Sequence, residues 1–199
     1  RWCANAPEFA DELAALTADE DALTDAFRCE LSFGTAGLRG IIGAGPNRMN
    51  TYTVGKATQG LANYLNAHYD NPSVAIARDS RNMGDSFVQT VARVLAANGV
   101  TAYVYTRPVP TPACSFAVRH LGCSAGINVT ASHNPAAYNG YKVYGDDGCQ
   151  IASEAADAIQ ASINETDFFS GIKTMPMDEA VAAGLVKWIA QETLDAFLD

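Results

Sequence analysis

A serine, a histidine and a lysine lie close together in the segment TASHNPAAYNGYK, which runs from Thr130 to Lys142. A serine hydroxyl can act as a nucleophile, an imidazole can move a proton, and a lysine can serve as acid, base or counter-charge. The apolar run that leads into the segment, 124–129, has the character of a buried strand, so Ser132 is predicted to follow a strand end. Ligands of open α/β sheets bind beyond the carboxyl ends of the strands, and a reactive hydroxyl there would face a substrate.

The Ser132–His133 pair suggests a serine hydrolase, but that chemistry needs a G-x-S-x-G elbow and a histidine brought in by the fold. Neither condition is met in the sequence. Neighbouring side chains of an extended segment point to opposite sides, so His133 is predicted to donate a hydrogen bond to a substrate or phosphate oxygen and not to deprotonate Ser132. The structural alternative is that Ser132, His133 and Asn134 only cap a tight turn.

Lys142 is the stronger candidate partner for Ser132. Asn139-Gly140 is a typical hairpin-turn dipeptide and is predicted to reverse the chain, which would bring Lys142 back beside Ser132. Lys142 and Tyr144 would then share one face of the second strand. A lysine beside a nucleophile can act as general acid or base, or as a counter-charge. The alternative is an ordinary solvated lysine on a strand.

Glycines dominate the segment FGTAGLRG, in which Gly34, Gly37 and Gly40 would let the backbone approach an anion closely. Arg39 in the same segment offers a planar guanidinium for phosphate contacts. The spacing is not that of a dinucleotide-binding loop. The alternative interpretation is a hairpin within Phe33–Met49 that simply requires small residues.

Two further groups of charged residues admit both a functional and a structural interpretation. Asp79 and Arg81 follow an apolar strand, where they would contact substrate or form an ion pair that steadies the loop. Asp146 and Asp147 precede a glycine, and that pattern favours a turn over a metal site.

The composition narrows the class of protein. The chain has 199 residues, 48% of them hydrophobic, and its 13 basic and 22 acidic residues give a formal charge of −9. This charge argues against nucleic-acid and membrane partners, so an anionic ligand would need a local cluster of cations. No apolar run is long enough to span a bilayer, no signal peptide is recognisable and the five cysteines include no CxxC pair, which together predict a cytoplasmic protein.

Strand and helix patterns alternate along most of the chain. The spacing predicts two short helices within 6–31, a helix capped by Thr51, a strand at 73–77, a helix closed by Asn98-Gly99, a strand at 101–105, a helix at 113–121, the strand 124–129, and helices at 153–163 and 186–198. We therefore predict an α/β fold with three layers, α/β/α, around a mixed, mainly parallel sheet of about four strands plus a hairpin. The predicted organisation is an N-terminal helical extension (1–32) packing on the α/β/α domain (33–185), followed by the start of a helix that leads to a second, absent domain (186–199).

Taken together, FGTAGLRG, ARDSR, RPVPTP, TASHNPAAYNGYK and YGDDGCQI resemble, in order and spacing, the first domain of the α-D-phosphohexomutases. The resemblance covers about 31–163, and LSFGTAGLRG with GAGPNRMN is most similar to the bacterial phosphoglucomutase and phosphopentomutase-like branch. It implies an isomerase that moves phosphate between the 1 and 6 positions of a hexose through a phosphoserine and a bisphosphorylated sugar.

The resemblance also implies roles for individual residues. Ser132 would carry the phosphoryl group, and its phosphate oxygen would be a ligand of Mg²⁺. Lys142 would be the general acid and base, Arg39 and His133 would assist catalysis, and Arg39, His133, Asn134 and Lys142 would bind substrate or phosphate. Glucose 1,6-bisphosphate would be the activator and intermediate.

Members of the family use four domains, and a DxDxD loop in the second supplies the other metal ligands. No DxDxD occurs in these 199 residues, so the remaining domains of a longer chain are expected partners, and residues 1–199 alone are expected to be inactive or nearly so. Glucose, mannose and pentose phosphates all stay open as substrates, with glucose favoured. The competing functions are a serine hydrolase and a catalytically silent module that binds sugar phosphates.

Overall fold

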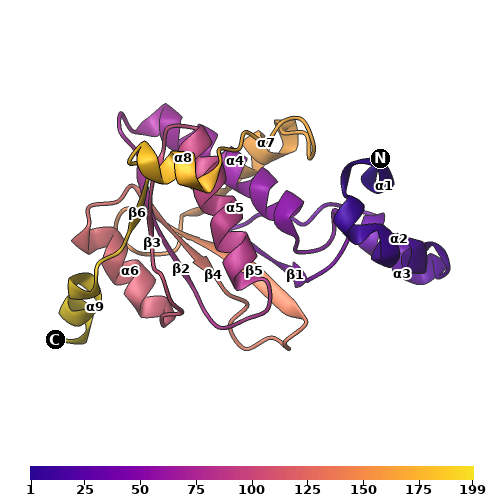
Figure 1. The fold of residues 1–199 in the computed structure, drawn as a ribbon, viewed down its shortest axis with the longest axis horizontal. Coiled ribbons are helices and arrows are strands. Elements are labelled where there is room, and N and C mark those ends of the chain that lie inside the picture. The colour runs from indigo at the N-terminus through magenta and orange to yellow at the C-terminus, as the bar shows by residue number, and fades with distance from the viewer.

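The computed structural model describes residues 1–199 and consists of one mixed sheet with helices on both faces (Figure 1). The α/β class and the mixed, mainly parallel sheet predicted from the sequence are confirmed. The helices are α1 (Trp2–Asn5), the 3-10 helix η1 (Pro7–Phe9), α2 (Ala10–Thr17), α3 (Glu20–Phe27), α4 (Thr51–His68), α5 (Gly84–Ala97), α6 (Thr111–His120), α7 (Ser153–Glu165), α8 (Met177–Ala182) and α9 (Gln191–Leu198). The strands are β1 (Leu38–Ile41), β2 (Ser73–Arg78), β3 (Thr101–Val104), β4 (Ala125–Val129), β5 (Tyr138–Tyr144) and β6 (Val186–Trp188).

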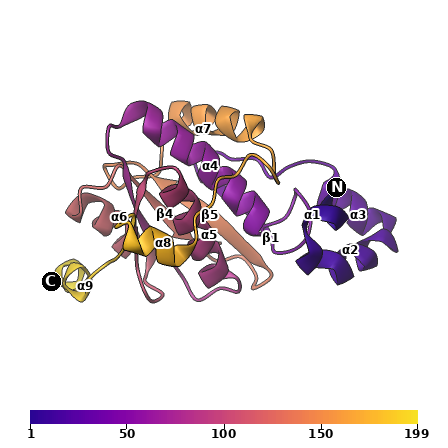
Figure 2. The same ribbon diagram turned by 45° about the horizontal axis from the view of Figure 1, so that its top comes forward.

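The sheet has six strands in the order β1-β5-β4-β2-β3-β6, more than the sequence predicts. Strands β4, β2, β3 and β6 are parallel, whereas β5 runs antiparallel to both β4 and β1. Helices α4, α5, α7 and α8 lie on one face, and α6 and α9 lie on the other (Figures 1 and 2). Helices α1 to α3 form a separate group beyond β1, where Trp2 lies 5.5 Å, ring to ring, from both Tyr52 and Phe169.

Alternation along β5 explains how the sheet separates its two cores. Tyr141 and Val143 are fully buried in the larger cluster beneath α4, and Thr58 of α4 donates a hydrogen bond of 3.2 Å to the Tyr141 hydroxyl. Because successive side chains of a strand point to opposite faces, Lys142 and Tyr144 lie on the other face, and Tyr144 joins the cluster beneath α6. The predicted sharing of a face by Lys142 and Tyr144 is therefore confirmed.

The hairpin predicted within Phe33–Met49 is wrong. Strand β1 pairs with β5, about a hundred residues further along, in a register that places Arg39 opposite Gly140. The small residues of this segment suit a close approach to another part of the chain, and local sequence could not indicate that distant partner.

The chain reversal predicted at Asn139-Gly140 is also wrong, because both residues lie inside β5. The chain instead reverses across 130–137, the loop that carries Ser132. Glycine is required at position 140 of β5, because a Cβ there would lie 2.5 Å from the Thr130 carbonyl oxygen and 2.9 Å from the Leu38 carbonyl oxygen. The backbones of β4, β5 and β1 are in contact at this point.

Two predicted helix boundaries need correction as well. Asn50, not Thr51, caps α4: its side chain accepts hydrogen bonds from the backbone of Tyr52 and Thr53, and the Thr53 hydroxyl accepts one from the Asn50 backbone. The helix predicted from Val186 begins only at Gln191, because 186–188 form strand β6 beside β3. Three residues are too few for a periodicity to separate strand from helix.

Replacing Gly140 with alanine is expected to destabilise the fold by about 1–3 kcal/mol, the usual cost of overpacking a rigid core. Urea unfolding would measure the loss. Gly34→Ala is the matched control, because a Cβ at Gly34 meets nothing within 4 Å. Equal stability of the two variants would contradict the backbone packing described here.

No helix of the structure has both the length and the hydropathy that a membrane-spanning segment requires. Cys114 and Cys123 are buried, whereas Cys3, Cys29 and Cys149 are exposed, and none forms a disulfide. Burial raises the pKa of the Cys114 thiol to about 12, so this cysteine behaves as a small apolar side chain.

Candidate active site

The loops after β2 and β4 meet at one edge of the sheet. The two strands are parallel neighbours whose last residues, Arg78 and Val129, lie opposite each other. The chain continues from β2 into Asp79 and Arg81, and from β4 into Thr130 and Ser132. Both loops line an open cavity of about 460 Å³. The sequence prediction that Ser132 follows the end of a strand at the ligand-binding edge of the sheet agrees with this position.

Arg81 holds the serine loop through its backbone. Its two terminal nitrogens donate to four carbonyl oxygens of that loop, at distances between 2.7 and 3.0 Å. The four acceptors are the carbonyls of Ser132, Asn134, Pro135 and Tyr138. Only 14% of the Arg81 side chain is exposed, so these charge-assisted bonds are partly shielded from water. One side chain thus fixes the path of the whole reversal between β4 and β5.

Asp79 and Thr130 complete the support of the loop. The Asp79 carboxylate accepts a hydrogen bond from the Thr130 hydroxyl at 2.6 Å, and it lies 3.3 Å from Nε of Arg81. The Thr130 hydroxyl oxygen in turn accepts a hydrogen bond of 3.0 Å from the backbone N–H of Ser132. The Asp79 carboxylate is therefore connected, through the Thr130 hydroxyl, to the backbone of Ser132, the candidate nucleophile.

Ser132 adopts a left-handed backbone conformation, with φ of 58°. A residue other than glycine occupies this region at a cost of about 1–3 kcal/mol and stays there only when its surroundings enforce it. Arg81 and Thr130 provide that enforcement through the contacts described above. The result is an exposed hydroxyl at the edge of the cavity, presented by a rigid backbone.

His133 contacts Ser132, contrary to the argument from an extended segment. The distance between Ser132 Oγ and His133 Nδ1 is 3.4 Å, which is long for a hydrogen bond. The left-handed conformation of Ser132 rotates the two neighbouring side chains toward one another, and the rule of opposite sides applies only to extended backbone. No carboxylate hydrogen-bonds to His133, so the structure contains no serine, histidine and acid triad.

Arg39 and Lys142 approach the loop from the sheet itself. Arg39 donates a hydrogen bond of 3.1 Å to the side-chain oxygen of Asn134, which connects β1 to the serine loop. Arg39 of β1 pairs with Gly140 of β5, and Lys142 lies two residues further along β5, where it pairs with Asn128 of β4. Side chains two residues apart on a strand point to the same face, so Arg39 and Lys142 are diagonal neighbours on one face of the sheet. Lys142 is half-buried and forms no hydrogen bond or ion pair within the chain.

The Ser132 loop itself contains His133 and Asn134, and Arg39 contacts it through Asn134. Lys142 lies on the neighbouring strand β5. From the sequence, Asp79 and Arg81 could be expected to contact substrate or to form an ion pair, but Arg81 could not be identified as the residue that organises the loop. The only sequence signal was that both residues follow a buried strand, because the four carbonyl partners of Arg81 lie more than fifty residues away.

Comparison with known proteins agrees with this architecture. Residues 30–170 match the family described as phosphoglucomutase/phosphomannomutase, alpha/beta/alpha domain I. The chain belongs to this family. It is 41% identical over 181 residues to a phosphoglucomutase of Staphylococcus saprophyticus, a match that covers 91% of this chain and 33% of that protein. A phosphoglucomutase of Staphylococcus aureus is 47% identical over 141 residues, which cover 71% of this chain and 26% of that protein.

Solved structures show the same fold. A protein from Thermus thermophilus, described as a phosphomannomutase, superposes with a TM-score of 0.69 and 29% identity over 86% of this chain and 37% of its own. A phosphoglucomutase/phosphomannomutase family protein from Burkholderia thailandensis, 24% identical, gives a TM-score of 0.58 over 80% of this chain and 32% of its own. The chain therefore spans between about a quarter and somewhat more than a third of the length of the relatives that it matches.

Proposed function

We propose that this chain is the catalytic-serine domain of a phosphohexomutase that interconverts hexose 1-phosphate and hexose 6-phosphate, with glucose as the favoured hexose. The observation that carries the proposal is the strained, clamped position of Ser132, whose exposed hydroxyl borders a polar cavity at the ligand-binding edge of the sheet. Membership of the phosphoglucomutase/phosphomannomutase family supports the reaction class. The relatives named phosphoglucomutase favour glucose over mannose or pentose.

In the proposed reaction, phosphorylated Ser132 donates its phosphoryl group to a free hydroxyl of a bound sugar phosphate. The bond between Ser132 Oγ and phosphorus breaks, a bond between the sugar oxygen and phosphorus forms, and the proton of the sugar hydroxyl passes through Lys142 to the freed Ser132 Oγ. The sugar 1,6-bisphosphate then reorients, and its other phosphoryl group returns to Ser132 Oγ, whose proton passes back through Lys142 to the departing sugar oxygen. The enzyme ends phosphorylated as it began, and glucose 1,6-bisphosphate would supply the first phosphoryl group.

Phosphoryl transfer depends mainly on positioning and on neutralising charge, and the site offers both. Arg81 and Thr130 fix the backbone of Ser132, so the nucleophile requires little reorganisation. We propose that Arg39 and His133 donate hydrogen bonds to phosphate oxygens, with Asn134 holding the Arg39 guanidinium in place. This cluster would supply the local positive charge that an anionic ligand needs in a chain of net charge −9.

The family implies Mg²⁺, which would neutralise charge on the transferred phosphoryl group. No group of three or more His, Cys, Asp and Glu side chains in the structure could hold a metal ion. The nearby Asp79 carboxylate already accepts from Thr130 and faces Arg81. We propose that Mg²⁺ is held through a phosphate oxygen on Ser132 and that its further ligands come from other domains of a longer chain.

Lys142→Arg is expected to lower kcat of the full-length protein by about 10²- to 10⁴-fold, the usual contribution of a general acid or base. Arginine keeps the positive charge but does not exchange its proton at neutral pH. Lys187→Arg is the matched control, because Lys187 is an exposed lysine on β6. Wild-type kcat in Lys142→Arg would mean that Lys142 acts only as a counter-charge.

Residues 1–199 alone are expected to form no measurable glucose 6-phosphate from glucose 1-phosphate in the presence of Mg²⁺ and glucose 1,6-bisphosphate. The same assay on a chain that extends to the full length of the relatives is expected to show turnover. Turnover by residues 1–199 would contradict the proposed division of the site between domains. Labelling of Ser132 by a fluorophosphonate probe, without mutase activity in the longer chain, would instead favour a hydrolase.

A further inference from the structure

A second cavity lies at the opposite end of the sheet from Ser132. It has a volume of about 290 Å³ and is lined by residues where β4 begins, Ser124 and Ala125, and where β5 ends, Val143 and Tyr144. Ser132 follows the other end of β4. The proposed phosphoryl transfer therefore makes no use of this cavity.

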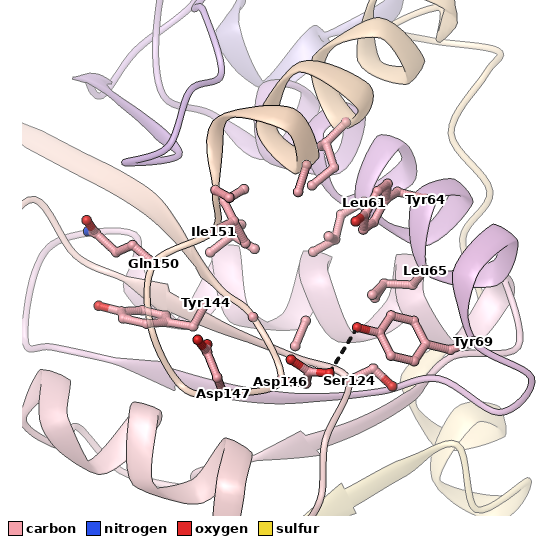
Figure 3. A pocket seen from close by; sticks show the side chains of 16 residues that line it. Leu61, Tyr64, Leu65, Tyr69, Ser124, Tyr144, Asp146, Asp147, Gln150 and Ile151 are labelled. Atoms are coloured by element: carbon pink, nitrogen blue, oxygen red, sulfur yellow. Dashed lines mark hydrogen bonds between the residues drawn. The ribbon is translucent and has the colours of Figure 1, made fainter.

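The cavity has an apolar floor and aromatic walls. Leu61 and Leu65 of α4 and Ile151 after β5 form part of the floor (Figure 3). Tyr64 and Tyr69 also line the cavity, whereas the ring of Tyr144 points away from it and belongs to the cluster beneath α6. Tyrosine rings carry negative charge on their faces and attract cations that come within about 6 Å of the ring centre. Two such rings beside one apolar space are suited to a ligand with both an apolar body and a positive charge.

Two carboxylates border the same cavity without a cationic partner. Asp146 and Asp147 lie in the turn after β5, which is fixed by a hydrogen bond of 2.8 Å from the Cys149 N–H to Asp147 Oδ1. Neither carboxylate forms an ion pair, and no lysine, arginine or histidine is among the residues that line the cavity. The charged groups that line the cavity are therefore all negative.

Tyr69 holds Asp146 at the cavity. Its hydroxyl points at the carboxylate in Figure 3 and donates a hydrogen bond of 3.3 Å to Asp146 Oδ2. Burial, and secondly the charge of Asp146, raise the pKa of the Tyr69 phenol, which keeps the phenol a neutral donor. Asp146 is therefore held at the mouth of the cavity as a fixed negative charge.

The negative charge and the composition of this cavity exclude the two ligands proposed for the Ser132 site, a sugar phosphate and a metal ion. A sugar phosphate would bring further negative charge toward two carboxylates that have no cationic partner. A bare metal ion would find no group of three or more His, Cys, Asp or Glu side chains to bind it. The volume lies at the lower end of the range for small-molecule sites, about 300–1,000 Å³, so a ligand of one ring and a short chain fits. We propose that this cavity binds a small organic cation, a protonated amine carried on an apolar or aromatic body.

Calorimetric titration of the protein with 2-phenylethylamine tests the proposal against two molecules of similar size and shape. The neutral 2-phenylethanol and the anionic phenylacetate share the ring but lack the positive charge. We expect saturable binding of the amine, and binding at least about tenfold weaker for the alcohol, which corresponds to about 1.4 kcal/mol. Equal affinity for amine and alcohol, or no binding of the amine, would overturn the proposal.

Two variants locate the charge that is responsible. Asp146→Asn and Asp147→Asn are each expected to weaken amine binding several-fold, and Asp147→Asn leaves the bond between Tyr69 and Asp146 intact. Asp157→Asn is the matched control, because this carboxylate is exposed on α7 and does not line the cavity. Unchanged amine affinity in both cavity variants would refute the proposed site. Saturating glucose 6-phosphate is expected to leave amine binding unchanged, and competition between them would place the amine at the phosphate site and overturn the proposal.

Discussion

Replacing Ser132 with alanine is expected to abolish mutase activity of the full-length protein, lowering kcat by about 10⁴-fold or more, because the residue proposed to accept and donate the phosphoryl group is removed. The fold is expected to remain intact, since the Ser132 side chain is exposed and its only side-chain hydrogen bond is the long one to His133. Coupled measurement of glucose 6-phosphate formation and urea unfolding would separate the two effects.

Ser80→Ala is the matched control for this prediction. Ser80 is an exposed serine that lines the same cavity from the β2 loop, so its hydroxyl experiences a similar environment without the left-handed backbone of Ser132. We expect kcat within about twofold of wild type for this variant, as is usual when no reacting group is removed. An active Ser132→Ala variant, or equal losses in both variants, would show that the nucleophile is not Ser132.

Replacing Arg81 with alanine is expected to produce the second large effect, on stability and on activity together. Four carbonyl oxygens of the serine loop lose their common donor, and Asp79 loses its ion-pair partner. Because hydrogen bonds to charged groups contribute about 1.5–3 kcal/mol each and part of this loss is recovered by water, we expect a destabilisation of about 2–4 kcal/mol. A displaced nucleophile would lower kcat by at least about 10²-fold.

Arg81→Lys tests whether the forked geometry matters or only the charge. A single ammonium group cannot reach four carbonyls from a planar array, so most of the loss in kcat is expected to persist. Arg78→Lys is the control, since Arg78 lies at the end of the same strand but pairs with Asp85 and does not contact the serine loop. Wild-type activity and stability in Arg81→Ala would contradict the role of Arg81 as the clamp of the loop.

Elements with strong local patterns could be predicted from the sequence alone. Strands β2 and β3 lie within one residue of their predicted bounds, and helix α5 ends at Ala97, beside the predicted Asn98-Gly99 cap, because continuous apolar runs and a capped helical stripe are local signals. The strand before Ser132 was predictable for the same reason. The pairing of β1 with β5 was not, since it depends on contacts about a hundred residues apart.

The same distinction applies to the site. Ser132 and His133 could be proposed as candidates because their residue types and their position after a strand are visible in the sequence, and Lys142 because of its residue type and its nearness in the sequence. Asn139-Gly140 suggested the wrong turn, because a close approach of three backbones selected the glycine at position 140. The left-handed conformation of Ser132 and the four bonds of Arg81 arise only when the β2 and β4 loops meet.

The most direct test of the central claim is the site of phosphate on the protein. The full-length protein would be incubated with glucose 1,6-bisphosphate and Mg²⁺, digested, and examined by mass spectrometry for the peptide that contains Ser132. The proposed mechanism predicts one phosphoryl group on Ser132, which is lost on incubation with excess glucose 1-phosphate and absent in Ser132→Ala. Phosphate on another residue, or none in a protein that shows mutase activity, would contradict it.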